Sequence, residues 1–210
     1  MSRATTELRD RWTPELIQRA AEAFRGRTVL TPFPPVIHDG TDYHDLRGLT
    51  IREPVRDVAF DRVDLSHART DYAGQFIGIT ATGCLFVAAV VDTNLSGTFE
   101  RCNFDGAKLG GATIFGGSSF TECTFVKADL RGTKGAALKF DRCDFTSANF
   151  RGTRLSESDF IDCRWDGTRF FHASLGSSKI TRAGFPVEKG VQEGDLILPD
   201  VILDHVKWLD

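Results

Sequence analysis

Long apolar runs and an excess of charge of one sign are both lacking in this sequence. No stretch approaches the about 20 apolar residues that a membrane-spanning helix needs. The first residues, MSRATTELRDRW, lack the apolar core of a secretory signal. A net charge of −3 and a pI near 6.0 lack the basic bias typical of nucleic-acid-binding proteins. We therefore expect a cytoplasmic protein without direct nucleic-acid binding or membrane contact.

The residue patterns of common catalytic and metal sites are also missing. The sequence contains no GxSxG, P-loop or HExxH motif, and its five histidines are scattered without ligand spacing. None of the five cysteines forms a CxxC pair, which disfavours both zinc and redox sites. We therefore predict a protein that is not an enzyme and has no cofactor, no metal and no catalytic residues.

What the sequence does contain is a five-residue period. Every fifth residue from Phe120 to Phe185 is large and apolar, with Gly135 as the exception. Two residues before each of them stands a small residue, with Leu138 as the one large exception. A period of five matches neither a helix nor a strand. It indicates stacked repeats, each burying its apolar residue against its neighbours.

Individual repeats resemble a known family. The triplets that carry the resemblance are Ala128-Asp129-Leu130, Ala148-Asn149-Phe150, Cys143-Asp144-Phe145 and Ser158-Asp159-Phe160. They resemble the A(D/N)LXX consensus of pentapeptide repeat proteins, and the resemblance extends over about residues 45–185. It implies an all-β solenoid, a right-handed quadrilateral β-helix with the central Leu or Phe stacked inside. At the strand spacing of β-sheets this array makes about 6–7 coils.

With four repeats per coil, residues 20 apart should stack on one face, and residue types do recur at that interval. The predicted core columns are Cys102, Cys123, Cys143 and Cys163, then Phe104, Phe125, Phe145 and Trp165, and on the next face Ala68, Ala88, Ala107, Ala128 and Ala148. Cysteine at such a position is interpreted as a small apolar filler, because buried thiols are unreactive.

Segments on either side of the array are expected to cover its ends. Residues 1–44 hold a polar start, a helix over 13–25 capped by Thr13 and Pro14, and a proline-rich linker. Residues 45–185 are expected to form the β-helix. Residues 186–210 are expected to be a C-terminal cap or a dimerisation tail.

The period is irregular between residues 70 and 120. A frame with Gln75, Thr80, Leu85 and Val90 inward connects Thr70 to Leu95. The next inward residue, Phe99, follows Leu95 after four residues in place of five, and Phe120 follows Ile114 after six. The missing and the extra residue restore the original period, which indicates a local bulge. This frame points several apolar residues outward or to corners, namely Phe76, Ile77, Ile79, Phe86, Val87, Ala89 and Val91. They are expected either to lie beneath the N-terminal helix or linker, or to form an interface with another chain.

Three functions remain open from the sequence. The first is a non-enzymatic interaction module that binds a protein partner through its faces or ends, with a homodimer through the C-terminal segment as one arrangement. The second follows from resemblance to MfpA- and Qnr-type members, which implies a DNA-mimicking protector of gyrase or another type II topoisomerase, conferring quinolone-type or toxin self-resistance. The third is an enzyme with a cleft between the rod and its N-terminal segment. Mimicry needs a strongly negative face, whereas acids and bases of the array are nearly balanced.

Overall fold

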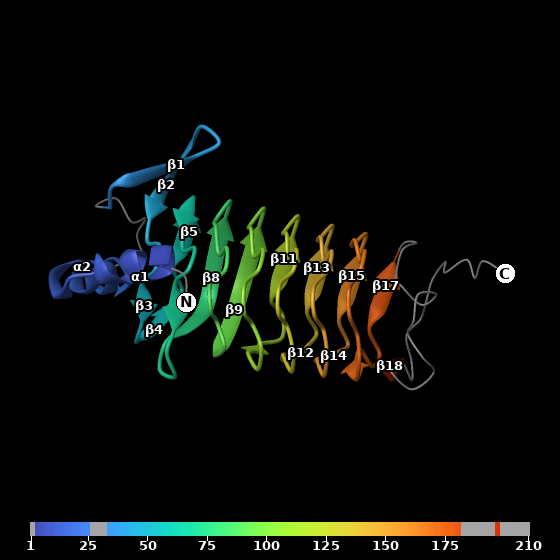
Figure 1. Cartoon of the computed structure of the whole chain (residues 1–210). Coiled ribbons are helices and arrows are strands. Elements are labelled where there is room, and N and C mark those ends of the chain that lie inside the picture. Colours follow the sequence, from blue (N-terminus) through green and yellow to red (C-terminus); the bar gives the residue numbers. More distant parts are fainter. Residues whose placement is uncertain (1–2, 26–32, 182–195, 198–210) are drawn as a thin grey trace.

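The chain is a right-handed quadrilateral β-helix of about seven coils with two helices at its N-terminal end (Figure 1). The computed structural model describes residues 3–25, 33–181 and 196–197. The predicted fold class is therefore confirmed. Within the described residues no helix is long and apolar enough to cross a membrane.

The four faces of the rod are defined by columns of inward residues. The first face is Leu46, Leu65, Phe86, Phe104, Phe125, Phe145 and Trp165; the second is Ile51, Thr70, Val91, Leu109, Leu130, Phe150 and Phe170. The third is Val55, Phe76, Leu95, Ile114, Gly135, Leu155 and Leu175; the fourth is Phe60, Ala81, Phe99, Phe120, Phe140, Phe160 and Ile180.

Short parallel strands connect each coil to the next. The third face carries β4 (Pro54–Arg56), β10 (Thr113–Ile114), β12 (Lys134–Ala136), β14 (Arg154–Ser156), β16 (Ala173–Ser174) and β18 (Leu196–Ile197). The fourth carries β5 (Ala59–Asp61), β11 (Ser119–Thr121), β13 (Lys139–Asp141), β15 (Asp159–Ile161) and β17 (Lys179–Thr181). Two longer strands, β8 (Gln75–Thr82) and β9 (Asn94–Glu100), run along both of these faces. The other faces hold β3 (Thr50–Ile51), β7 (Arg69–Thr70) and β6 (Val63–Asp64), and then single bridges in later coils.

The frame predicted for residues 75–91 is wrong by one position. Gln75, Thr80, Leu85 and Val90 are not buried, and their successors fill the inward places. A turn at Asp71–Gly74, in which the Asp71 carboxylate accepts the Gly74 N–H at 3.2 Å, makes the step from Thr70 to Phe76 six residues long. Hence five of the seven residues expected to point outward or to corners lie in the core: Phe76, Ile79, Phe86, Ala89 and Val91. Ala89, not Ala88, likewise belongs to the alanine column.

The cancelling steps between Leu95 and Phe120 do form local irregularities. Gly97 has a φ of 144°, and the β8–β9 register shifts between Phe76 and Ile79. A Cβ on Gly97 would lie 1.9 Å from the Ile79 carbonyl oxygen, so only glycine allows this close approach. The extra residue between Ile114 and Phe120 lies in the turn at Gly116 and Gly117, and Gly117 has a φ of 80°.

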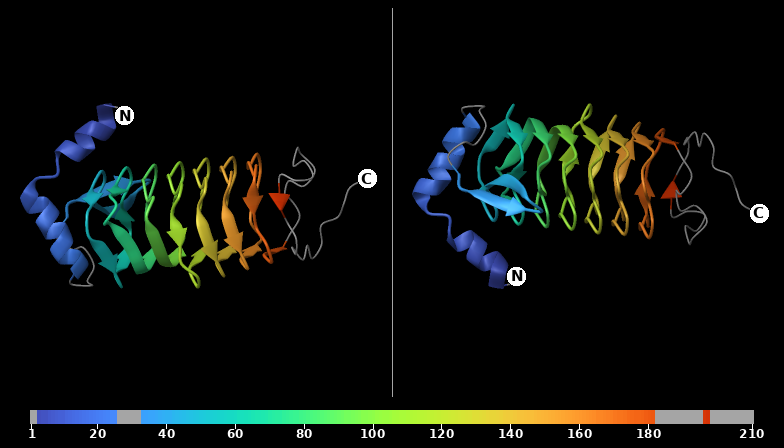
Figure 2. Two further views of the ribbon diagram at one scale, coloured as in Figure 1. Left: turned by 90° about the horizontal axis from the view of Figure 1, so that it is seen from below. Right: turned by 90° about the horizontal axis from the view of Figure 1, so that it is seen from above.

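The N-terminal segment contains more structure than the sequence analysis predicted. Helix α2 (Pro14–Arg25) matches the predicted helix, and its Leu16 N–H is 3.4 Å from the capping Thr13 hydroxyl. The expected frayed start forms α1 (Arg3–Asp10), and part of the expected linker forms an antiparallel hairpin of β1 (Pro35–His38) and β2 (Thr41–Asp45). Both helices lie at the N-terminal end of the rod (Figure 2).

Of the predicted C-terminal segment, the structure describes only β18. This strand pairs in parallel with β16, with Leu196 opposite Ala173. The remainder of 186–210 lies outside the described residues, as does the predicted final inward residue Phe185.

Candidate binding surfaces

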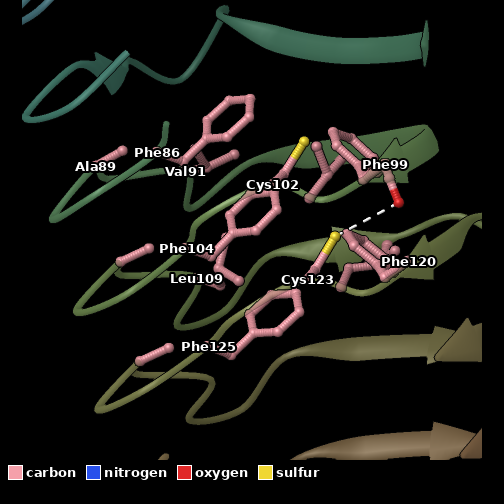
Figure 3. Close-up of a cluster of buried hydrophobic side chains, with 14 of the residues drawn as sticks. Phe86, Ala89, Val91, Phe99, Cys102, Phe104, Leu109, Phe120, Cys123 and Phe125 are labelled. Carbon is pink, nitrogen blue, oxygen red and sulfur yellow. Dashed lines mark hydrogen bonds between the residues drawn. The ribbon is translucent and has the colours of Figure 1, made fainter. Parts of the chain in front are cut away.

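The interior of the array is filled by stacked side chains. On the first face, the rings of Phe86, Phe104 and Phe125 stack with centroids 4.6 Å and 4.9 Å apart (Figure 3). The fourth-face rings of Phe99 and Phe120 stack in the same way at 4.8 Å. Fully buried rings at these separations leave only the outside of these coils for a partner.

The cysteines belong to this interior. All five are free and buried: Cys84, Cys102, Cys123, Cys143 and Cys163. Each thiol donates to a main-chain carbonyl of the preceding coil, as Cys123 Sγ does to the Phe99 oxygen at 3.4 Å (Figure 3). Burial raises the pKa of the Cys84 thiol well above its ordinary value. No group of residues suited to a metal ion occurs in the part of the chain that the structure describes.

A charged cluster anchors the N-terminal segment to the first face. The Asp45 carboxylate accepts two 2.6 Å hydrogen bonds from Arg11 and one of 2.9 Å from Arg47 Nη2. Although burial raises the pKa of Asp45, the hydrogen bonds from these two arginines outweigh it and hold that pKa well below its usual range. Trp12 Nε1 adds a hydrogen bond to the Arg47 carbonyl oxygen at 2.9 Å.

The hairpin is held by a second, fully buried carboxylate. Asp64 accepts from the Ser66 N–H at 2.8 Å and lies 2.7 Å from His38 Nε2. This cluster was not predicted, although the sequence contains two signals for it. Asp45 and Asp64 occupy the same outward position of successive coils, and Asp39-Gly40 is a typical two-residue hairpin turn.

Two hollows lie beside this segment. One, of about 460 Å³, lies between the hairpin and the first face, and Tyr43, Arg47, His67 and Val87 are among its lining residues. Burial raises the pKa of Tyr43. This is the place of the cleft considered for an enzyme, but the Asp64 carboxylate there is occupied by structural hydrogen bonds. The other hollow, of about 370 Å³, lies between α2 and the first coil.

Only two members of the predicted interface cluster remain near the surface. Val87 is half-buried beside the hairpin, and Ile77 is half-buried on the third face. The large apolar side chains that are exposed lie apart from each other, on the hairpin and on separate repeats: Ile37, Tyr72, Phe115 and Phe171. The described surface therefore offers scattered apolar side chains in place of the single apolar interface that was predicted.

Acids on the outside of the rod are repeatedly paired with arginine. The pairs are Asp129 with Arg131, Glu122 and Asp141 with Arg142, Asp144 with Arg164, Glu100 with Arg101, and Asp61 with Arg62. Several of these pairs lie along the corner that joins the fourth face to the first. Arginine side chains therefore lie among the acidic side chains at this corner and offset their negative charge.

Comparison with protein families agrees with the coil geometry. Eight copies of the pentapeptide repeat are recognised, over residues 99–134 and 139–176. The chain carries an array of pentapeptide repeats. The match begins at Phe99, directly after the last four-residue step.

Among solved structures, this chain is similar to HetL, a pentapeptide repeat protein involved in heterocyst differentiation regulation from the cyanobacterium Nostoc. They share 15% identity with a TM-score of 0.44, over 65% of this chain and 72% of HetL. It is also similar to QnrB1, a plasmid-mediated fluoroquinolone resistance protein, with 18% identity, a TM-score of 0.32, and coverage of 75% and 92%. No curated protein sequence matched the chain.

Proposed function

We propose that this chain is a non-enzymatic interaction protein that binds a protein partner through the outward faces of its β-helix. The observation that supports this proposal is the filled interior, which confines binding in the regular coils to the outside. Solenoids bind partners through the extended outer surface that their stacked repeats create.

DNA mimicry and gyrase protection are the less favoured alternative. A mimic must present carboxylates in place of phosphates as a strong negative field. In this protein the acids Glu122 and Asp144 each lie within 4 Å of an arginine from the following coil, Arg142 and Arg164. Supercoiling by DNA gyrase, with and without a quinolone, should therefore be unchanged by micromolar protein, and a dose-dependent effect would support the protector function instead.

Photo-crosslinking in the native host tests the interaction itself. A photoreactive residue is placed at one exposed position of each face of the full chain: Arg164, Arg151, Lys134 and Lys139. We expect at least one position to give a discrete crosslink to another protein, and the others to act as matched controls. Absence of any crosslink from all four faces would contradict an interaction function.

A further inference from the structure

Basic side chains gather where the second face meets the third, in the later coils. Six of them share this region with a single outward acid, Asp129, and define the basic ridge: Lys108, Arg131, Lys134, Arg151, Arg154 and Arg169. All six are exposed, and the chain as a whole carries a net charge of −3. The ridge is therefore a local reversal of the protein's charge.

Backbone register places these like charges close together. Lys134 on β12 is directly opposite Arg154 on β14, strands that are neighbours along the rod (Figure 1). The turns before them repeat as well, with Gly132 N–H donating to the Arg151 carbonyl oxygen at 3.0 Å. Like charges directly opposite each other across a sheet are destabilising. The stability of the fold therefore does not explain why two basic residues face each other on β12 and β14.

Little within the ridge neutralises its charge. Asp129 pairs with Arg131 at 2.7 Å, and Arg151 lies over the Phe171 ring at 4.9 Å. In the residues that the structure describes, Lys134, Arg154 and Arg169 form no ion pair. A partner's carboxylates would supply the missing counter-charges.

We propose that the basic ridge docks an acidic α-helical segment of a partner protein, lying along the rod axis; this rests on the interaction function proposed above. Successive coils are about 4.8 Å apart. Carboxylates three and four residues apart on one face of a helix are about 5–6 Å apart. The adjacent charges of the ridge lie on two successive coils, in the rows Arg131–Arg151 and Lys134–Arg154. The helical spacing matches this coil spacing to within about 1 Å, whereas alternate residues of an extended strand, about 6.7 Å apart, exceed it by about 2 Å.

Nucleic acid is the less suitable occupant. The net charge of the chain is −3, and the acids on the other faces oppose a polyanion that extends beyond the ridge. Duplex DNA is therefore included in the test as the competing ligand.

Fluorescence anisotropy with two helical peptides of equal composition tests the proposal. One peptide has its glutamates on one face at every third and fourth position, and the other has them distributed around the helix. The full-length protein is expected to bind the first peptide and to lose about tenfold in affinity with Lys134→Gln plus Arg154→Gln. The matched control, Lys139→Gln plus Lys179→Gln, removes the same charge from the fourth face and should bind like the wild type.

Equal binding of both peptides, an unaffected ridge variant, or tighter binding of duplex DNA would each overturn the proposal. The crosslinking experiment separates this failure from failure of the proposed function. Crosslinks at Arg164 or Lys139 with none at Lys134 or Arg151, the two positions within the ridge, would reject the ridge and retain the interaction function. A supporting result is a crosslink at Lys134 to an acidic helical segment that disappears with Arg154→Gln.

Discussion

At the scale of single residues, Gly135 and Leu138 compensate each other. They are the two exceptions to the repeat, one too small and the other too large. A Cβ on Gly135 would lie 2.8 Å from Leu138 Cδ1 and 2.9 Å from the Ile114 carbonyl oxygen. Leu138 thus fills the space that a large residue occupies in the other coils, and each exception requires the other.

This compensation predicts a measurable coupling. Gly135→Ala should destabilise the protein by about 1–3 kcal/mol through overpacking. In a Leu138→Ala background the same substitution should cost less, because the contact with Cδ1 is gone while that with the Ile114 oxygen remains. Urea unfolding of the four proteins of this double-mutant cycle should give a coupling of at least about 0.5 kcal/mol. Additive effects would show that the two exceptions are independent.

The Asp45 carboxylate predicts a pH dependence. Asp45→Asn should cost about 2 kcal/mol at neutral pH, because charged hydrogen bonds from Arg11 and Arg47 are lost. Since the folded pKa is lowered, this stabilisation is present above the ordinary carboxyl value of 3.8 and is lost as the pH falls through the folded pKa. Unfolding curves of variant and wild type should therefore converge in acid. Asp162→Asn, at an exposed corner, is the control and should show no such convergence.

At the scale of elements, α2 lies across the end of the first coil. The Phe24 ring contacts Phe60 edge-on at 5.8 Å, and Ala20 is fully buried. We predict that Phe24→Ala uncaps this end, so that amide exchange accelerates in β3, β4 and β5 but not in β13 and β15. Phe171→Ala, which truncates an exposed aromatic residue, is the control. Uniform acceleration along the rod would show that α2 stabilises the whole fold and not one end.

The facing strands β12 and β14 predict a substitution that increases stability. Lys134→Glu places opposite charges across the register at Arg154 and should stabilise the fold by about 0.2–1 kcal/mol. A rise in Tm, reduced by added salt, is the expected result. Unchanged or lowered Tm would mean that Lys134 and Arg154 do not repel each other in the folded protein.

The sequence predicted the regular coils well because each buried position there repeats one residue type. It failed where a turn changed the frame, since Asp71–Gly74 inserts one residue that no apolar pattern records. The frame error placed Phe76 and Phe86 outside, and with them the predicted interface. The basic ridge was missed for a different reason. Lys134 and Arg154 are 20 residues apart, so the predicted coil already stacks them, but that spacing was applied to the inward positions and not to the charged outward ones.

At the scale of the whole molecule, the coil is a removable unit. Deleting residues 141–160 joins Phe140 to Ile161, which occupies the position of Asp141 one coil later. This shortened rod should fold with native-like circular dichroism and a lower Tm, because solenoid stability is summed over neighbouring repeats. Deleting 141–159 instead shifts all later inward residues by one position and should prevent folding of those coils. Equal folding of both deletions would contradict the register.

The first-face column of phenyl rings ends in an indole. Trp165 stacks on Phe145 at 4.8 Å and is 2% exposed, while Trp12 belongs to the helical end of the molecule. With Trp208, which lies outside the described residues, replaced by Phe, two tryptophans remain. Trp12 lies between α1 and α2 and Trp165 follows β15, elements near opposite ends of the rod (Figure 1). Replacing either tryptophan with phenylalanine leaves one tryptophan at one end of the rod. The emission wavelength of that tryptophan then reports whether the coils at its end unfold first.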